Sequence, residues 1–435
     1  MKKPLNYIPF TREMKKTYKI LVPEMLPMHF KIIAEYLKSV GYDVDVLSSH
    51  GKKIAETGLK YVHNDTCYPA ILVIGQFIDA LLSGKYDVHK TALIYFQTGG
   101  GCRASNYISL LRKALKKAGL GFVPVISVSL NGLEKHPGFR LSPSFAVKMF
   151  YCIFYGDLLL SLKNQVEPYE TNAGETERVA NDITERLGRE VKTMKLSFKT
   201  VEKRCAEIID EFGKIPVRKT DKVRVGVVGE IYVKFSALGN NGLEKLLLSE
   251  GAEPVVPGLM DFFIYTVYAK ITDCKLFGLN RKLLPVFTIL YKFLLSKQKR
   301  FIDVIKRDGR FDAPTSFDEI VGLVDGYIDT GVKMGEGWLL TAEMLELKER
   351  GVKNIVCAQP FGCLPNHICG KGMMKPLKDR NPDMNIVAVD YDAGASKVNQ
   401  DNRIKLMLAL ARDGETRTDA FDLSPISRQY KGEIV

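Results

Sequence analysis

Hydrophobic residues in the first third of the chain follow two spacings in turn. The segments TYKILVP and DVDVL, at 17–23 and 43–47, are short apolar runs typical of buried strands. Between them, MHFKIIAEYLKSVGY has the spacing of an amphipathic helix that Gly41 closes. A helix from near Pro69, the strand TALIYFQ, the helix ASNYISLLRKALKKAG and the strand FVPVISVS continue the alternation. This order predicts a parallel sheet with crossover helices.

The alternation stops between about residues 165 and 220 and then resumes. The intervening sequence, which includes ERVANDITERLGREV and TVEKRCAEIIDEF, is charged and helical without a strand pattern, so we expect a helical connector. Beyond it, VRVGVVGEI parallels YKILVPEM, NIVCAQPFGCLPNH parallels LIYFQTGGGCRASNY, and NIVAVDYD parallels VPVISVS. The sequence therefore predicts an α/β fold of two pseudo-repeated lobes, each with a mainly parallel sheet flanked by helices.

The repeat also sets the expected domain boundaries. They are 1–165 for the first α/β lobe, 166–220 for the helical connector, 221–412 for the second α/β lobe and 413–435 for a polar C-terminal tail. The corresponding residues Glu24 and Cys102 are 78 positions apart, whereas Glu230 and Cys363 are 133 apart. The second lobe must therefore carry an insertion, which we assign to the apolar and basic stretch at about 259–310.

The composition describes a soluble globular protein, with 46 % hydrophobic and 26 % charged residues among 435. The N-terminal MKKPLNYIPF lacks the apolar run of a signal peptide, and charges interrupt the most apolar region, Leu259 to Leu295. Buried helices explain that region, and Trp338 in GEGWLLTAEM is expected to begin another helix and pack in the core. We expect a cytoplasmic protein with reduced cysteines and no membrane partner.

The net charge is +13, from 63 basic and 50 acidic residues. The lysines are spread along helices such as LRKALKKAG and IKLMLALAR, with neither a block of about five like charges nor a nucleic-acid fingerprint. A solvated surface is the simpler explanation, so no nucleic-acid partner is expected. An anionic substrate such as an acyl-coenzyme A, or an acidic protein partner, is the alternative.

Three of the eight cysteines stand where a loop turns into a helix. Cys67, Cys102 and Cys363 lie in NDTCYPA, QTGGGCRASNY and QPFGCLPNH, next to residues that expose backbone amides. Such amides and the positive end of a helix dipole favour a thiolate, so we expect lowered thiol pKa values and metal or cluster ligands. Because Cys102 and Cys363 follow corresponding strands, two facing lobes would bring both to one cleft, where Cys67 joins them.

The expected centre is a 4Fe-4S cluster. The sequence contains no Cys-x-x-Cys pair, and no histidine lies near Cys102, which disfavours structural zinc. Three thiolates with one open position suit a four-iron cluster instead. Backbone amides of glycines would approach the sulfides of such a cluster. The expected cofactor-binding glycines are Gly99, Gly100, Gly101 and Gly362.

The remaining five cysteines are interpreted differently. Cys152, Cys205 and Cys274 lie in helical or apolar sequence, where a cysteine is usually a small buried hydrophobe. Cys357 lies in the strand NIVCAQ and Cys369 in the following HICG, and the sequence leaves both open. Cys357, Cys369 and Cys274 are the residues that would extend the ligand set to a second cubane.

Acid and base candidates are few. His63 and His367 each lie four residues from one of the three helix-edge cysteines, where a histidine can donate a proton near a cluster. A hydrogen-bonding role explains each of them equally well. Glu24 and Glu230 follow corresponding strands and rank below the histidines, because carboxylates in such places also cap helices.

Four segments resemble the 2-hydroxyacyl-CoA dehydratase superfamily, which includes the double-cubane cluster proteins. They are NDTCYPAILVIGQ, QTGGGCRASNY, GEGWLLTAEM and QPFGCLPNHICGKGM. The likeness is greatest to the region fused behind activator domains in very large proteins of anaerobes, and it extends from TYKILVP to NRIKLMLALAR. It implies that Cys67, Cys102 and Cys363 are cluster ligands.

The resemblance also implies a partner and a reaction. In such systems an ATP-hydrolysing activator of the ASKHA type, itself an iron-sulfur reductase, drives low-potential electrons into the partner's cluster. This chain shows no GxxxxGKS/T phosphate loop and is similar to the partner, which forms homo- or hetero-dimers. In the dehydratase branch, the reduced cluster acts on a 2-hydroxyacyl-CoA thioester.

Other functions remain open at this point. In the double-cubane branch, an 8Fe-9S cluster held by six cysteines reduces small molecules instead of a thioester. A non-catalytic iron-sulfur electron carrier would use the same cysteines without turning over a substrate. A basic scaffold without metal is the fourth alternative, and it predicts a colourless protein after anaerobic purification.

Overall fold

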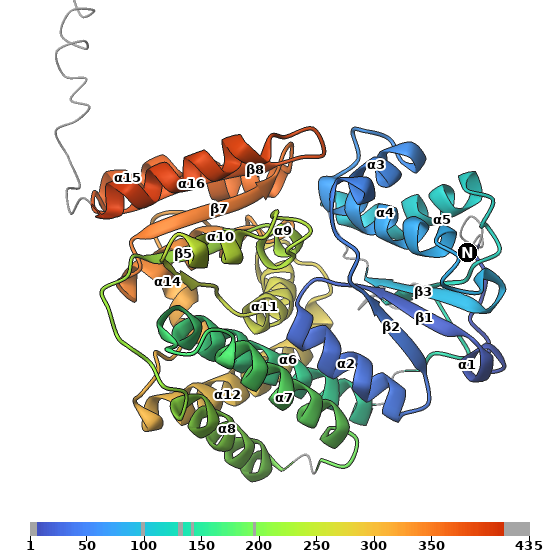
Figure 1. Cartoon of the computed structure of the whole chain (residues 1–435), viewed down its shortest axis with the longest axis horizontal. Helices are drawn as coiled ribbons and strands as arrows, with labels where there is room; N and C mark the ends of the chain where they lie inside the picture. Colours follow the sequence, from blue (N-terminus) through green and yellow to red (C-terminus); the bar gives the residue numbers. More distant parts are fainter. Residues whose placement is uncertain (1–6, 97–100, 129–133, 141–142, 195–196, 413–435) are drawn as a thin grey trace, which may run out of the picture.

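The computed structural model describes residues 7–96, 101–128, 134–140, 143–194 and 197–412 (Figure 1). The expected tail, 413–435, lies outside the described residues. Within them the chain forms two four-stranded sheets in which every strand pair is parallel. The predicted α/β fold of two lobes, each with a parallel sheet flanked by helices, is therefore confirmed.

The two sheets have the same strand order. The first contains β1 (Lys19–Pro23), β2 (Asp43–Leu47), β3 (Thr91–Phe96) and β4 (Val125–Val128) in the order β2-β1-β3-β4. The second contains β5 (Arg224–Gly229), β6 (Glu253–Val255), β7 (Asn354–Pro360) and β8 (Asn385–Tyr391) in the order β6-β5-β7-β8. The central strands β1, β3, β5 and β7 are almost continuously buried, as expected for strands covered on both faces.

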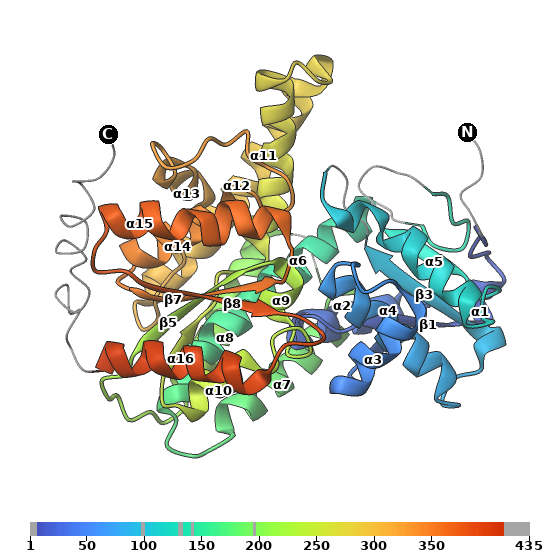
Figure 2. The same ribbon diagram turned by 90° about the horizontal axis from the view of Figure 1, so that it is seen from above.

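Helices cover these sheets. The first lobe contains α1 (Met14–Thr17), α2 (Pro27–Ser39), α3 (Lys52–Tyr61), α4 (Tyr68–Leu82) and α5 (Tyr107–Lys117). In the second lobe, α9 (Ile231–Phe235) follows β5, and α13 (Phe317–Leu323) precedes α14. Figure 2 shows α14 (Leu339–Glu349) and α15 (Met374–Arg380) on one face of the second sheet, and α10 (Leu243–Ser249) and α16 (Lys397–Arg412) on the other.

Close contact between α3 and α4 fixes the start of α4. A Cβ on Gly58 would lie 2.1 Å from the carbonyl oxygen of Ile71, and a Cβ on Gly75 would lie 2.1 Å from that of Ile54. Only glycine at both positions lets the two helix backbones approach this closely. The residue before α4 is Cys67, so this crossing also positions one of the predicted ligands.

Three further helices connect the lobes. They are α6 (Pro143–Val166), α7 (Glu175–Glu190) and α8 (Phe198–Gly213), drawn in green in Figure 1. Among the described residues one helical segment, Ser144–Tyr169, has the length and apolar composition of a membrane span, and 61 % of its most apolar window is buried inside the protein. The core helix of a soluble protein has these same properties.

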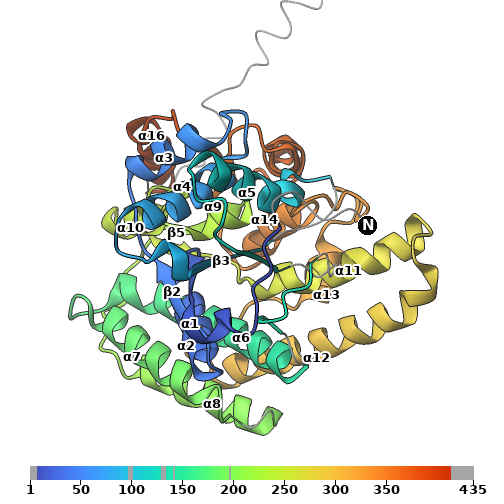
Figure 3. The same ribbon diagram turned by 90° about the vertical axis from the view of Figure 1, so that its right-hand side faces the viewer.

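The stretch after β6 forms a helical arm. It consists of α11 (Met260–Leu276) and α12 (Leu284–Asp308), which run side by side and project away from the body of the protein (Figures 2 and 3). At its base lies Trp338, which is 0 % exposed and contacts the rings of Tyr265 and Phe317 at centroid distances of 5.4 and 6.0 Å. The prediction that Trp338 packs in the core is therefore confirmed.

Candidate iron-sulfur site

Each of the three predicted ligands directly precedes a helical turn. Cys67 is the residue before α4, and Cys102 is the residue before the 3-10 turn Arg103–Asn106. Cys363 comes before a helical turn that continues into the π-helical turn Asn366–Gly370. The expected placement at helix starts is confirmed, and π-helical turns are frequent at functional sites.

Cys102 from the first lobe and the segment of Cys363 from the second lobe meet at Gly335. A Cβ on Gly335 would lie 3.9 Å from Cys102 Sγ and 3.0 Å from Cγ of Pro365, two residues after Cys363. Cys67 interacts electrostatically with Cys102 and with Cys363. The three thiols therefore lie in one region at the boundary between the lobes, as the strand-end argument predicts.

Two buried carboxyl groups, Glu230 and Glu336, share this region. They are 9 % and 8 % exposed, and both interact electrostatically with all three thiols. Glu230 accepts a hydrogen bond from the amide of Val233 at 2.9 Å and so caps α9, which is the alternative role expected for it. Glu336 accepts from the amide of Ile231 at 3.0 Å. Burial raises the pKa of both carboxyls. The charge of Glu336 contributes to the raised pKa of Glu230, which is about 8.

Each thiol also has a hydrogen-bond donor. The hydroxyl of Tyr107 lies 3.3 Å from Cys67 Sγ. The Asn366 side-chain amide lies 3.4 Å from Cys363 Sγ and 3.5 Å from Glu336 Oε2, so it links a thiol to a carboxyl group. The backbone amide of Ala104 lies 3.5 Å from Cys102 Sγ. Donors aimed at sulfur stabilise negative charge on a thiolate and tune a bound cluster.

The expectation of lowered thiol pKa values is wrong. Burial raises the pKa of Cys67 to about 12, with a further contribution from Glu230, and it also raises the pKa of Cys102 and of Cys363. The amide of Ala104 lowers the pKa of Cys102, but desolvation is the larger effect. In the metal-free protein the thiols therefore stay protonated at neutral pH, and loading of a metal centre must release their protons.

The predicted glycines have different outcomes. Gly99 and Gly100 lie outside the described residues. The amide of Gly101 lies 3.2 Å from Met334 Sδ in the second lobe, so this glycine takes part in the contact between the lobes. Gly362 has a φ of +71° with open space around it, a turn conformation that glycine adopts readily. No described contact places Gly362 against a sulfur atom.

The two predicted histidines lie in contrasting surroundings. The side chain of His63 is 73 % exposed and pairs with Asp65 at 3.1 Å. His367 lies one turn after Cys363 and donates its backbone amide to the carbonyl of Cys363 at 2.9 Å. Its Nδ1 atom is buried and has no hydrogen-bond partner among the described residues. Of the two, His367 is the one that the structure holds beside the thiols.

The other cysteines are all buried, as expected for Cys152 and Cys205. Cys357 lies inside β7, where its electrostatic neighbours are side chains other than the three thiols. Cys274 belongs to the arm, and its Sγ lies 3.6 Å from the carbonyl of Asn280. Cys369 lies on the π-helical turn and interacts electrostatically with Glu336. The structure therefore brings Cys369 near the site. Cys357 lies against the same turn, because a Cβ on Gly370 would lie 3.0 Å from its Sγ. Among the described residues, no contact joins Cys274 to the site.

The sequence-based reasoning missed Glu336 and Asn366. Glu336 lies between two glycines in the segment GEGWLLTAEM. The tryptophan and the apolar spacing of this segment predict a core helix, and they give no sign that the glutamate is buried. Glu24, the counterpart of Glu230 in the first lobe, is partly buried and lies 3.5 Å from His50. Burial raises its pKa as well. The two strand-end glutamates thus differ, and the second one faces the thiols.

The donor set at the boundary between the lobes consists of the thiols of Cys67, Cys102 and Cys363. Among the described residues, no group of three or more His, Cys, Asp or Glu side chains is close enough to hold one metal ion. A four-iron cluster makes a looser demand, because each thiolate binds a different iron atom. Three partly buried thiols from both lobes, each with a hydrogen-bond donor, are compatible with that requirement.

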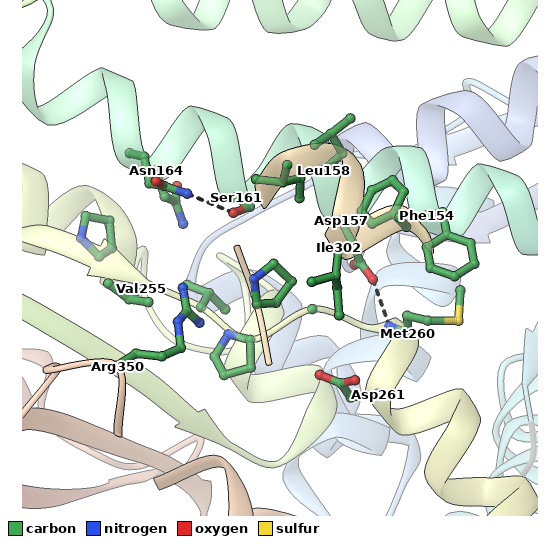
Figure 4. A pocket seen from close by; sticks show the side chains of 18 of the residues that line it. Phe154, Asp157, Leu158, Ser161, Asn164, Val255, Met260, Asp261, Ile302 and Arg350 are labelled. Atoms are coloured by element: carbon green, nitrogen blue, oxygen red, sulfur yellow. Dashed lines mark hydrogen bonds between the residues drawn. The ribbon is translucent and has the colours of Figure 1, made fainter. Parts of the chain in front are cut away.

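One cavity lies away from this site. It has a volume of about 60 Å³ and is enclosed by α6, β6 and α12, with Asp157, Asp261 and Arg350 in its wall (Figure 4). Its lining contains neither the three cysteines nor the two buried glutamates.

No known protein-family model matches the chain, and no curated protein matches it. The residues at the boundary between the lobes are therefore the ones that point to a function.

Proposed function

We propose that Cys67, Cys102 and Cys363 hold a 4Fe-4S cluster through which this chain accepts low-potential electrons and reduces a substrate bound beside it. The observation that carries this proposal is the meeting of three partly buried thiols, contributed by both lobes, at one boundary. Such a cluster supplies single-electron transfer and, with three protein ligands, keeps one iron open to a further ligand.

The chain's own residues would prepare this site. Tyr107, Asn366 and the amide of Ala104 are placed to donate to the three sulfur atoms and so to stabilise their negative charge. Burial and the charge of Glu336 raise the pKa of Glu230, which favours its neutral form and so limits the negative charge beside the thiolates. Tyr107, Asn366 and Glu230 are buried, which limits water around them and strengthens each electrostatic interaction.

The source of electrons in this proposal is a separate ATP-hydrolysing activator, as in the 2-hydroxyacyl-CoA dehydratases that the cysteine segments resemble. The substrate is then an acyl-CoA thioester, the protein acts as a homo- or hetero-dimer, and it works in the cytoplasm, where cysteines stay reduced. The larger 8Fe-9S cluster is the less favoured alternative, because Cys357 and Cys274 lie within a strand and the arm without a contact to the three thiols.

Metal analysis of anaerobically purified protein tests the cluster. We expect about four irons and about four acid-labile sulfides per chain, whereas a bridged double cubane gives about eight irons and about nine sulfides. Replacing Cys102→Ala should abolish iron loading. The control Cys205→Ala makes the same change at a buried cysteine on α8 and should retain iron. Full iron content in the Cys102→Ala variant would contradict the ligand assignment.

A second measurement separates enzyme from carrier. The loaded protein is mixed with an ATP-driven activator and a 2-hydroxyacyl-CoA, and both reduction of the cluster and consumption of the thioester are followed. Reduction together with turnover supports the enzymatic role. Reduction without turnover of any acyl thioester supports the non-catalytic carrier, and a colourless protein after anaerobic purification supports the metal-free scaffold.

A further inference from the structure

The end of the helical arm projects from the rest of the protein and touches it near Leu276 and Phe277, where the Lys333 ammonium lies 5.7 Å from the Phe277 ring centroid. We call residues 275–293 the arm tip; it comprises the end of α11, the connection and the first turns of α12. None of these residues is buried. Figures 2 and 3 show this part of the chain, in yellow, projecting beyond all neighbouring elements. The first residue of α12 that packs on the core is Tyr291, whose ring lies 6.3 Å from that of Phe317, so roughly 10 Å of that helix precedes this contact.

The arm tip exposes an unusual number of large apolar side chains. Eight of them are between 42 % and 70 % exposed: Leu276, Phe277, Leu279, Leu283, Val286, Ile289, Leu290 and Phe293. Single exposed apolar residues are normal, but a contiguous group of this size marks an interaction surface. A solvated helical hairpin would carry polar residues here, so the composition requires an apolar environment around the tip.

All charged residues of the arm tip are basic. Lys275, Arg281, Lys282 and Lys292 lie among the apolar residues, and the chain has no acidic residue from Cys274 to Ile302. In the part of the chain that the structure describes, none of these four residues forms an ion pair. The tip therefore combines apolar side chains with unpaired positive charges.

We propose that the arm tip docks this protein onto the surface of an anionic lipid bilayer. Its leucine, phenylalanine, valine and isoleucine side chains enter the boundary between headgroups and acyl chains, while the lysines and arginine extend to lipid phosphates. Each basic residue near such a surface strengthens binding. This function goes beyond electron transfer at the cysteine site and does not depend on it.

Shape and charge favour lipid over a protein partner. The tip is a projecting end, so a protein would need a matching deep groove, whereas a bilayer accommodates a protruding apolar tip directly. A second copy of this chain would bring two exclusively basic tips together, and like charges oppose that contact. The expectation of no membrane partner considered only segments that span a bilayer, and docking at its surface requires no such segment.

Flotation with lipid vesicles tests the proposal. The full chain is mixed with vesicles of phosphatidylcholine and phosphatidylglycerol, or of phosphatidylcholine alone, and centrifuged in a density gradient. We expect flotation with the anionic vesicles only, and weaker flotation at high salt. The double variant Arg281→Gln and Lys282→Gln should lower the partition coefficient roughly thirtyfold. The double variant Leu276→Ser and Phe277→Ser should abolish flotation.

The matched control is a substitution of an exposed leucine outside the arm tip. Leu406→Ser changes a leucine on α16 that is 63 % exposed, and it should float like the unmodified protein. Absence of flotation with anionic vesicles, or equal loss in Leu406→Ser, would overturn the proposal. Light scattering decides the remaining alternative, because a dimer that the Leu276→Ser and Phe277→Ser changes dissociate would assign the tip to a second copy. Iron content is measured in parallel, so failure of lipid binding is distinguished from failure of the cluster site.

Discussion

Nε2 of His29, on α2 of the first lobe, lies 2.8 Å from Oδ1 of Asp157 on the connecting helix α6. Asp157 also accepts hydrogen bonds from the amides of Leu259 and Met260 at the start of α11, both at 2.8 Å. Figure 4 shows the bond to Met260. His29 is completely buried. One carboxylate therefore ties the first lobe, the connector and the second lobe together, and it helps to set how the lobes present their thiols to one another.

Replacing Asp157→Ala should destabilise the protein strongly. The change leaves two backbone amides and the buried imidazole without their acceptor, and each such loss costs about 1–3 kcal/mol. We expect the free energy of unfolding in urea to fall by at least about 3 kcal/mol. Asp182→Ala, at an exposed carboxylate on α7, serves as the control and should cost less than about 1 kcal/mol. Similar stability of the two variants would contradict the role of Asp157.

The ion pair of Glu134 with Arg112 predicts a pH dependence of stability. Arg112 Nη1 lies 2.5 Å from Glu134 Oε1, and Arg112 Nη2 lies 2.7 Å from Glu134 Oε2. Both side chains are buried. Burial alone would raise the pKa of Glu134, but hydrogen bonds from His136 and Arg112 together with the charge of Arg112 lower it to about 2. Because the folded-state pKa lies below the ordinary value of 4.5, this stabilisation is complete above about pH 4.5 and is lost as the pH falls towards about 2.

Urea unfolding at about pH 5 and about pH 3 measures this effect. The unmodified protein should lose more stability between these pH values than Glu134→Gln does, by about 1–2 kcal/mol. Glu177→Gln removes an exposed carboxylate on α7 and should behave like the unmodified protein. An unchanged pH dependence in Glu134→Gln would show that another group carries it.

The fold was largely predictable from the sequence because strands and helices leave local signals. The repeat in strand order, the helix from near Pro69 and the position of Trp338 all follow from apolar spacing and from the residues that begin helices. Helix α6 was not anticipated. It is apolar on most sides, and such a helix lacks the amphipathic spacing by which the neighbouring α7 and α8 could be recognised.

The candidate site was less predictable because it forms across two lobes. The glycines and prolines around each cysteine predict its position at the start of a helical turn. The pKa of each thiol, however, depends on burial by segments that are distant in the sequence. Glu336 is 106 positions from Glu230 in the sequence, yet the two carboxyls interact in the structure. No local pattern reveals a contact of that kind.

The Tyr107 hydroxyl gives a specific test of the cysteine site. Tyr107→Phe removes the donor to Cys67 Sγ and little else, so thiolate charge is less well stabilised. We expect the reduction potential of the loaded protein to fall by about 40 mV, equivalent to about 1 kcal/mol for one electron. A redox titration followed by electron paramagnetic resonance measures it.

Tyr95→Phe is the control for this change. The Tyr95 ring stacks on Tyr107 with centroids 5.7 Å apart, but its hydroxyl donates to no sulfur among the described residues. This variant should therefore keep the original potential. If both variants shift the potential equally, the effect arises from general packing around the rings, and the hydrogen bond to Cys67 has no special part in it.

The contact between the lobes at Gly335 can be tested with one methyl group. Gly335 has a φ of +60°, and a Cβ there would lie 3.0 Å from Cγ of Pro365 and 3.9 Å from Cys102 Sγ. Gly335→Ala should therefore cost about 1–2 kcal/mol of stability from backbone strain. It should also reduce iron loading, because the added methyl group pushes apart the segments that carry Cys102 and Cys363.

Gly322→Ala is the matched substitution away from the site. It lies within α13 with no atom within 4 Å of an added Cβ, and alanine favours a helix by up to about 1 kcal/mol. Urea unfolding should therefore show this variant to be as stable as the unmodified protein or more so, with full iron content. If Gly335→Ala also retained full iron content despite its lower stability, the spacing of the lobes at Gly335 would not control assembly of the cysteine site, and the ligands would have to tolerate separation of the two segments.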